Sequence, residues 1–257
     1  MPMSKKTKSK VAFGIDVGGS GIKGAPVDLE RGDFAADRVR IATPEPSTPD
    51  AVASVFTDLV ARFDLPDDAA VGVTFPAIIR RGVAFSAANV DPGWIGTDIA
   101  KVVKKATGHR AVVVNDADAA GYAEVVYGAA KGKDGLVIVL TLGTGIGSAM
   151  IYDGVLVPNS ELGHLEIDGH DAETQASSGV KDREGWSYEE WIPRLQRYFD
   201  VVEFLFSPDL FVVGGGVSKD HEKFLPFLKL HTPIVPAKLR NRAGIVGAAA
   251  LAAKASE

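Results

Sequence analysis

The sequence predicts an α/β protein with two similar halves. Short apolar, β-branched strands alternate with amphipathic helices along most of the 257 residues. In addition, the segments GIDVGGSGIKGA (14–25) and VLTLGTGIGSAM (139–150) share a pattern of strand, small polar residue, glycine-rich turn and second strand. Asp16 and Thr141 occupy matching places in them. The alternative is two unrelated glycine hairpins, because glycine turns are common.

The first half contains strand and helix signals in alternation. Strands are expected at Val11–Val17, with 22–28 as hairpin partner, and at 38–42, 70–75 and 111–115. Helices are expected at 49–63, capped by Thr48, at 98–107, ended by Gly108, and from Asp116 or Ala117 onward.

The second half repeats the theme. Strands are expected at 136–142, 148–152 and 210–213, with a turn at 153–154. Helices are expected at about 188–205, after Val217, and at about 243–253. Trp186, Tyr188 and Trp191 could pack at an interface but are more often core residues.

The composition excludes several classes of function. The absence of cysteine rules out disulfides, thiolate metal sites and cysteine nucleophiles. A net charge of −5 argues against a broad nucleic-acid surface, and no apolar run approaches the length of a membrane helix. Residues 1–10 are interpreted as a disordered basic tail, and the chain as cytoplasmic.

The two glycine-rich turns are predicted to hold phosphate groups. Glycine lets backbone N–H groups face an anion without an intervening Cβ atom. Asp16, in front of the first turn, would hold Mg²⁺ through water, and Lys23 could add a positive charge or face solvent. The pattern is neither the P-loop nor the dinucleotide GxGxxG, because here the glycines open a strand.

Asn115 and Asp116 follow an apolar strand, at the end where α/β folds place their ligands. An ionised Asp116 could accept the proton of an attacking hydroxyl group. The alternative is that this pair only caps the next helix. Asp118 is interpreted as a first-turn partner of the helix dipole.

The stretch ELGHLEIDGHDAETQAS (161–177) concentrates acidic residues and histidines. Such a set could bind the hydroxyl groups of a sugar, form a solvated acidic loop, or hold zinc.

Five motifs resemble those of the ROK family of sugar kinases, which has the actin-like ATPase (ribonuclease H-like) fold. They are DVGGSGIKG (16–24), NDADAAG (115–121), LGTGIGS (142–148), ELGH (161–164) and GGGVS (214–218). Within the family, SAANVD (86–91) and TPIVPAKLRNRAGIVGAA (232–249) are most similar to the short bacterial polyphosphate/ATP-dependent glucokinases, including the glucomannokinase type.

The resemblance implies two α/β domains with a cleft between them. A small N-terminal domain would span 11–112, completed by a C-terminal helix at about 241–257, and a large domain would span 113–240. It also implies phosphorylation of the 6-hydroxyl of glucose, and of mannose, from polyphosphate or ATP with Mg²⁺, by a homodimer. A non-catalytic sugar-binding regulator and a kinase for another substrate are the alternatives. DNA binding is not expected, because only about ten residues precede the first strand.

The resemblance also assigns roles to individual residues. Asp116 would be the general base. Sugar hydroxyls would be bound by Asn89, Asn115, Asp116, Glu161, His164 and Glu173. The first phosphate loop would be formed by Asp16, Gly18, Gly19, Ser20 and Lys23, and the second by Thr141, Gly143, Thr144 and Gly145. Gly214, Gly215 and Gly216 would lie near the adenosine of ATP.

The chain also departs from the family pattern. Many members bind structural zinc through cysteines that follow the ExGH motif, so no zinc site is expected here and His164 is interpreted as a sugar ligand. Ala77 stands where the family usually has glycine in a loop near the sugar, which puts the sugar affinity in doubt. A basic path for polyphosphate could involve Lys131, Lys133, Lys181 and Arg183, or Lys101, Lys104 and Lys105.

Overall fold

The structure is a computed structural model that describes residues 11–256, so the tail predicted for 1–10 lies outside the described residues. The chain divides into two compact units. One comprises the chain up to Val114 together with the chain from Ala248 onward, and the other is Asn115–Gly247. The domain boundaries at 112 and 240 that the resemblance implies stay a prediction.

The first unit is built on a six-stranded mixed sheet of order β3-β2-β1-β5-β8, with β4 also paired to β2. The elements up to Asn115 are β1 (Val11–Gly18), β2 (Gly21–Asp28), β3 (Asp33–Phe34), β4 (Val39–Ile41), α1 (Pro49–Val60), β5 (Val71–Phe75), β6 (Ile79–Arg80), β7 (Val83–Ala84), the 3₁₀ turn η1 (Pro92–Trp94), α2 (Ile99–Thr107) and β8 (Ala111–Asn115).

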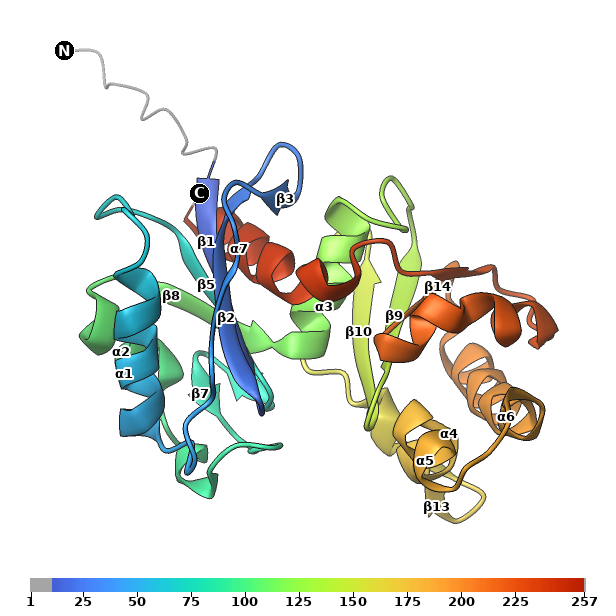
Figure 1. Cartoon of the computed structure of the whole chain (residues 1–257). Coiled ribbons are helices and arrows are strands. Elements are labelled where there is room, and N and C mark those ends of the chain that lie inside the picture. Colours follow the sequence, from blue (N-terminus) through green and yellow to red (C-terminus); the bar gives the residue numbers. More distant parts are fainter. Residues whose placement is uncertain (1–10, 257) are drawn as a thin grey trace. The chain divides into compact units, whose positions relative to one another are not determined.

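Alternation along β1 explains the two faces of this sheet. Phe13, Ile15 and Val17 are buried in one cluster with side chains of α1 and α2. The C-terminal part of α7 (Ala243–Ala255) lies on the other face (Figure 1). There Gly72 of β5 meets the main chain of Ala248, and a side chain on Gly72 would overlap that carbonyl group. Glycine at 72 therefore allows the helix to pack directly on the sheet.

The second unit is built on a five-stranded sheet of order β11-β10-β9-β14-β15. From Asp116 to Phe206 the elements are α3 (Asp116–Val126), β9 (Leu136–Leu142), β10 (Ile146–Tyr152), β11 (Val155–Val157), the 3₁₀ turn η2 (Leu162–His164), β12 (Glu166–Ile167), β13 (His170–Asp171), α4 (Glu173–Ala176), α5 (Ser178–Arg183) and α6 (Tyr188–Phe206). It ends with β14 (Leu210–Gly214), the 3₁₀ segments η3 (Gly216–Lys223) and η4 (Leu225–Phe227), β15 (Ile234–Pro236), the 3₁₀ turn η5 (Arg240–Arg242) and α7.

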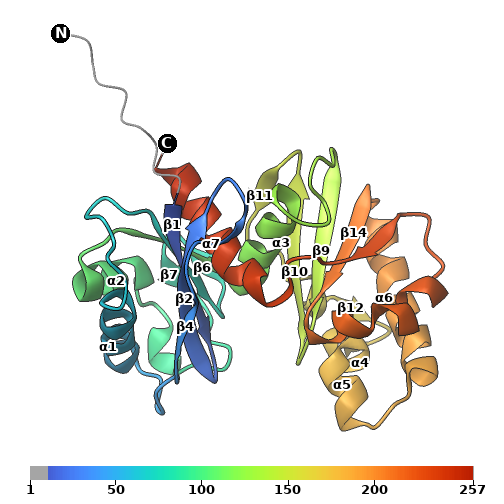
Figure 2. The same ribbon diagram turned by 45° about the horizontal axis from the view of Figure 1, so that its top comes forward.

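Strand β9 shows why both faces of this sheet are covered. Ile138 and Leu140 are buried with aromatic residues of α6, whereas Val137 and Val139 are buried with Val125 of α3. Helices α3 and α6 accordingly lie on opposite faces of the sheet (Figure 2). A continuous apolar strand is what a doubly covered sheet requires.

Most predicted elements are confirmed, and so is the α/β class. Thr48 and Asp98 cap α1 and α2, and Gly108 ends α2 in the left-handed conformation. The α-helix expected after Val217 is wrong, because the chain there forms the kinked 3₁₀ segment η3. Trp191 is fully buried, which confirms its interpretation as a core residue. Over residues 11–256, no helix is both long and apolar enough to cross a membrane.

Candidate functional site

The first glycine hairpin, in the first unit, carries a charged pair at its base. Asp16 on β1 faces Lys23 on β2, and the Lys23 Nζ atom lies 3.1 Å from Asp16 Oδ2. The other carboxylate oxygen accepts a hydrogen bond of 2.8 Å from Thr74 Oγ1 on β5. Lys23 therefore contacts the carboxylate rather than only facing solvent. Each Asp16 oxygen has a fixed neighbour, so the carboxylate is held in one orientation.

The turn of this hairpin is formed by Gly19 and Ser20, between the paired residues Gly18 and Gly21. Arg40 extends across it and donates to the Ser20 carbonyl at 2.6 Å. A side chain on Gly21 would meet the Arg40 guanidinium group, so Gly21 makes room for that cation. Arg40 thus adds a second positive charge beside the turn. It was missed from the sequence, because only β4–β2 pairing brings it there.

Asn89 lies beside this turn as well. A Cβ atom on Gly19 would lie 3.3 Å from both the Cβ atom and the carbonyl oxygen of Asn89. Asn89 has a left-handed backbone with φ of 58°, and it lines a pocket of about 440 Å³ with Gly19. The structure therefore groups this predicted sugar ligand with the first phosphate loop.

The second glycine hairpin, in the second unit, joins β9 to β10. Its turn, Gly143–Gly145, is closed by a hydrogen bond of 2.9 Å from the Gly143 N–H to the Gly145 carbonyl. Ser178 and Gly179 both donate to the Gly143 carbonyl, so the start of α5 supports the turn from outside. The turn residues themselves are uncharged.

The third glycine segment, 214–216, meets this second hairpin. Strands β9 and β14 are parallel, and their register pairs Gly214 with Thr141. Gly215 has φ of 84°, and a side chain there would overlap the main chain of Leu142. The predicted donor residues of the second unit, Thr141–Gly145 and Gly214–Gly216, therefore form one continuous surface at the carboxyl ends of two parallel strands.

Helix α3 begins where the sequence predicts. Asn115 Oδ1 accepts from the N–H groups of Ala117 and Asp118, so Asn115 is the N-cap and Asp116 is the first helical residue. The capping role that was left open for the Asn115–Asp116 pair belongs to Asn115. Asp116 thus stands at the junction of β8 and α3, with its side chain also accepting from the Ala117 N–H at 3.0 Å.

Asp118 is more than the helix-dipole partner predicted for it. Only 1% of the residue is exposed, and its Oδ2 atom accepts from the Asn159 N–H at 2.8 Å. Among the described residues, Oδ1 has no hydrogen-bond partner. Burial is the main cause that raises the pKa of Asp118 to about 7, and the negative charges of Glu161 and Asp116 contribute to the same rise. These interactions place Asp116 and Glu161 around one buried carboxyl group.

The ELGH stretch is fastened to β10. Ser148 Oγ donates to the Ser160 carbonyl at 2.6 Å and accepts from the Leu162 N–H at 2.9 Å. Gly163 packs against the Ile146 carbonyl without room for a side chain. Burial raises the pKa of Glu161, and the nearby charge of Glu173 adds to this effect.

Glu173 connects the acidic stretch to the second hairpin. Its Oε2 atom accepts from the Ile146 N–H at 2.9 Å, and the carboxylate occupies the space that a side chain on Gly145 would need. The polar stretch and the glycine turn are therefore parts of one structure within the second unit.

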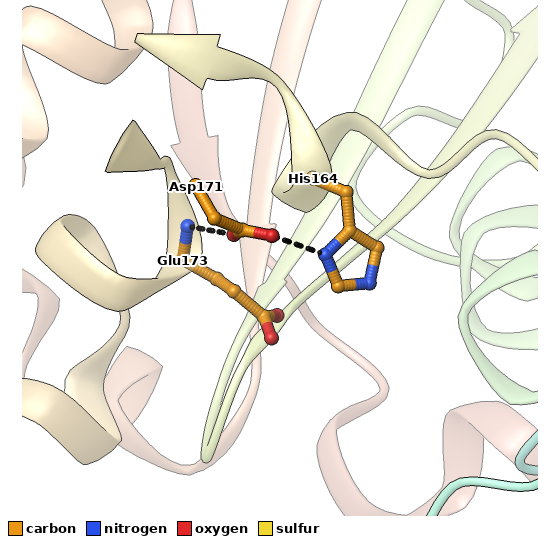
Figure 3. A group of neighbouring side chains, drawn as sticks. All are labelled: His164, Asp171 and Glu173. Atoms are coloured by element: carbon orange, nitrogen blue, oxygen red, sulfur yellow. Dashed lines mark hydrogen bonds and ion pairs between the residues drawn. The ribbon is translucent and has the colours of Figure 1, made fainter. Parts of the chain in front are cut away.

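His164 is oriented by a carboxylate that the predicted site residues do not include (Figure 3). Its Nδ1 atom lies 2.8 Å from Asp171 Oδ2, and the other oxygen of Asp171 accepts from the Glu173 N–H at 3.2 Å. This hydrogen bond to Asp171 raises the pKa of His164. Because an ionised carboxylate can only accept, Nδ1 carries the proton and Nε2 is left for a ligand.

The ligand atoms of His164, Asp171 and Glu173 all lie within 4.8 Å of one another, a spacing that could also suit a metal ion. Two of those groups already have specific partners, since Nδ1 of His164 bonds to Asp171 and Glu173 accepts from Ile146. This arrangement favours a site for sugar hydroxyl groups, and the absence of a zinc site stays a prediction.

The grouping of predicted residues follows the two units. Asp16, Gly18, Gly19, Ser20, Lys23 and Asn89 belong to the first unit, and the remaining predicted site residues belong to the second. Asp171 and Arg40 were missed. The seven-residue spacing of Asp171 from His164 gave no periodic signal, although both residues lie in the acidic stretch that the sequence singled out.

Known proteins resemble this chain over nearly its whole length. It is 48% identical over 244 residues to a polyphosphate glucokinase of Mycobacterium tuberculosis (strain CDC 1551 / Oshkosh), covering 95% of this chain and 91% of that protein. It is also 48% identical to a polyphosphate glucokinase of Mycobacterium leprae (strain TN), over 92% of this chain and 73% of that protein.

Solved structures agree. The inorganic polyphosphate/ATP-glucomannokinase from Arthrobacter sp. strain KM is 55% identical with a TM-score of 0.89, covering 96% of this chain and all of that chain. A ROK family glucokinase from Streptomyces griseus, in complex with glucose and AMPPNP, is 25% identical with a TM-score of 0.77, over 95% and 99% of the two chains. Residues 12–181 match the ROK family. The chain therefore belongs to the ROK family and has the actin-like ATPase fold of its sugar kinases.

Proposed function

We propose that this chain is a glucokinase that transfers the terminal phosphoryl group of inorganic polyphosphate or ATP to the 6-hydroxyl group of glucose. The observation that carries the proposal is the hydrogen bond from the Ile146 N–H to the Glu173 carboxylate, which connects the proposed phosphate-binding turn to the proposed sugar-binding stretch. The 48% identity to mycobacterial polyphosphate glucokinases supports the same reaction.

Asp116 is the proposed general base. It follows directly after β8, at the strand end where α/β proteins bind ligands, and Asn115 rather than Asp116 caps the helix. In this role its carboxylate accepts the proton of the 6-hydroxyl as that oxygen attacks the donor phosphorus. The P–O bond to the rest of the donor breaks as the new P–O bond forms.

Asn115, Glu161, His164 and Glu173 are the proposed ligands of the remaining sugar hydroxyls, and Asn89 is assigned to the sugar from the resemblance. Carboxylates accept from hydroxyl groups, and the amide Nδ2 of Asn115 can donate to them. Because its Nδ1–H group donates to Asp171, the His164 ring presents Nε2 to the sugar. Several fixed partners of this kind orient one hydroxyl toward the base.

The two glycine turns are the proposed donor site, with Asp16, Gly18, Gly19, Ser20 and Lys23 from the first unit and Thr141, Gly143, Thr144 and Gly145 from the second. Gly214, Gly215 and Gly216 would contact the nucleoside when ATP is the donor. Backbone N–H groups offset the phosphate charge without requiring a side chain.

Mg²⁺ is the proposed cofactor, and Asp16 fits it. Each Asp16 oxygen accepts one hydrogen bond and keeps a further lone pair, which suits a contact with the ion through water. The ion would neutralise part of the phosphate charge. The chain's own contribution is to hold the carboxylate between Lys23 and Thr74 so that it cannot turn away.

Mannose as a second substrate, a homodimer and a cytoplasmic location also belong to the proposal. The glucomannokinase that is 55% identical supports mannose. ATP and polyphosphate are intracellular donors, which supports the location. Initial rates with each donor on each sugar test the substrates, and sedimentation tests the subunit count.

Replacing Asp116 tests the mechanism. Asp116→Asn should lower kcat by roughly 10²–10⁴-fold while the dissociation constant for glucose changes little, because the amide cannot take the proton. Calorimetric titration of glucose and a sugar-phosphate assay measure both quantities. The exposed Asp134→Asn is a matched control that keeps full turnover. Near-normal turnover of Asp116→Asn contradicts the role of Asp116, and a wild-type protein that binds glucose but forms no sugar phosphate indicates a regulator.

A further inference from the structure

A groove with several basic side chains lies in the second unit, behind the glycine segment 214–216. It measures about 800 Å³, and we call it the basic groove. Its lining consists of Ala129, Ser218, His221, Val235, Pro236, Ala237, Lys238, Leu239, Arg240, Asn241 and Arg242. These lining residues include three permanent cations and a histidine but no carboxylate and no aromatic ring of the Phe, Tyr or Trp type. In a chain of net charge −5, such a concentration of one sign favours an anionic ligand.

The basic groove begins next to the second phosphate turn. Ser218 in its lining donates through Oγ to the Gly215 carbonyl at 2.8 Å. Gly215 packs against the main chain of Leu142, which directly precedes Gly143 of the turn. A chain of direct contacts within one unit therefore runs from the turn to the groove. An anion bound at the turn could extend into the groove without leaving this unit.

A buried carboxylate fixes the loop that carries two of the cations. Glu124 of α3 is only 1% exposed, and its oxygens accept from the backbone N–H groups of Lys238 at 3.1 Å and Leu239 at 2.7 Å. The Ala129 N–H, at the other side of the groove, donates to the same carboxylate at 2.7 Å. Because Glu124 bonds to the main chain only in these contacts, it fixes the loop without neutralising the Lys238 side chain, which is exposed.

We propose that the basic groove binds the part of a polyphosphate chain that trails behind the phosphoryl group being transferred. This inference rests on the proposed function and adds the path of its longer donor. A linear polyphosphate presents a negative charge at each internal phosphate, which matches Lys238, Arg240 and Arg242 along one groove. The groove lacks an aromatic surface on which a purine could stack, so its chemistry suits phosphate better than a nucleobase.

Three of the basic residues considered from the sequence already have partners of their own. Lys181 lies 3.1 Å from Asp182 and sits over the Tyr188 ring, and Arg183 pairs with Glu184. Lys101 pairs with Asp98. The KLRNR segment, 238–242, was noted only as part of a similarity, because its three cations come together with His221 and Ser218 only when β15 pairs with β14.

The test compares two double variants. Lys238→Gln with Arg240→Gln removes two exposed charges of the groove, and Lys223→Gln with Lys229→Gln removes two exposed lysines of the same unit outside its lining. The KM for long-chain polyphosphate, tripolyphosphate and ATP is measured with glucose at several salt concentrations. Binding of long-chain polyphosphate is also measured by calorimetry without glucose.

The groove variant should raise the KM for long-chain polyphosphate about tenfold, with a smaller rise of about twofold for ATP. For long-chain polyphosphate, the slope of log KM against log salt concentration should be smaller by about two in the groove variant, one for each cation removed. The lysine control should behave as wild type. Equal rises for ATP and polyphosphate, an effect confined to the lysine control, or no effect of either variant overturns the proposal.

The binding measurement separates this inference from the proposed function. If the wild type forms no sugar phosphate with any donor, the kinase proposal fails. In that case, about tenfold weaker polyphosphate binding by the groove variant still supports the groove, and equal binding by variant and wild type overturns it.

Discussion

The two glycine hairpins use a similar backbone but place their charges differently. In the first, Asp16 pairs with Lys23 in the register of the strands themselves, and Arg40 lies across the turn. In the second, the corresponding register pair is Thr141 with Gly147, and the charge at the turn comes from Glu173 on a different element. The first hairpin thus carries its own charged residues, whereas the second receives a carboxylate from the acidic stretch 161–177.

Two carboxyl groups, Asp16 of the first unit and Asp118 of the second, differ as well. Asp16 is partly exposed and has a lysine beside it, whereas Asp118 is buried, with no cation among the causes of its pKa shift. A buried carboxyl group without a cationic partner retains its proton to higher pH. The comparison teaches that residue type alone does not give the charge of a site. The following predictions test the two hairpins separately.

The largest effect is expected at Asp16. Asp16→Asn keeps an acceptor for Thr74 but removes the negative charge, so kcat should fall by roughly 10²–10³-fold while glucose binding is retained. Initial rates and calorimetry measure these quantities. Asp28→Asn is the matched control, because Asp28 also forms an ion pair, with Arg31, but at the opposite end of the same hairpin. A kcat for Asp16→Asn equal to that of the control would show that the charge is not used.

The next effect is expected at Gly145. A Cβ atom there would displace the Glu173 carboxylate and break its bond to the Ile146 N–H. Gly145→Ala should therefore lower kcat/KM by roughly 10²-fold. Gly143→Ala, which adds a Cβ atom into open space in the same turn, should lose clearly less. Thermal unfolding of both variants checks that the fold persists, and equal losses would mean that the Glu173 contact is unimportant.

A smaller effect is expected at Asp171. Asp171→Asn can still accept from His164 Nδ1 but lacks the charge, so the pKa of His164 should fall toward its ordinary value. The KM for glucose should rise about fivefold, with little change in kcat. The pH dependence of that KM should move to lower pH. The control is Asp168→Asn, a change on the same loop that breaks the exposed ion pair with Arg197 of α6. It should leave the pH dependence of the KM unchanged. An unshifted profile for Asp171→Asn would remove Asp171 from this role.

The last prediction is on stability rather than activity and concerns Asp118. Its pKa rises from 3.8 to about 7 on folding, so the folded protein binds a proton that the unfolded chain has already lost between these values. The free energy of unfolding should therefore decrease as pH rises from about 4 to about 7, by an amount on the order of 4 kcal/mol. In Asp118→Asn this contribution should disappear. Urea unfolding of both proteins at pH 4.5 and 8 measures it, and identical pH dependences would contradict the prediction.

Much of the fold could be predicted because its signals are local. Alternating apolar residues gave the hairpin strands, and Thr48, Asp98 and Gly108 marked helix ends that the structure confirms. Strand β15 was missed because the two residues between Pro233 and Pro236 give little periodic signal. The helix after Val217 was wrong because helical composition does not separate an α-helix from a 3₁₀ segment.

The candidate site shows the same limit more strongly. The glycine turns and the acidic stretch were visible in the sequence, and their assigned roles stay predictions. The contacts that organise them were not visible. Glu173 is 27 residues from Ile146, and Glu124 is 115 residues from Leu239. Burial of Asp118 depends in the same way on tertiary packing, which a first-turn position does not reveal.

The imidazole ring of the ELGH motif is oriented by a carboxylate oxygen atom, because its Nδ1 atom is hydrogen-bonded to Asp171. Residues 161–177 contain no sulfur atom that peroxide could oxidise, and the whole chain contains no cysteine. Purification without reducing agents should therefore leave this loop unaltered, which is convenient for an immobilised catalyst that is exposed to air for long periods.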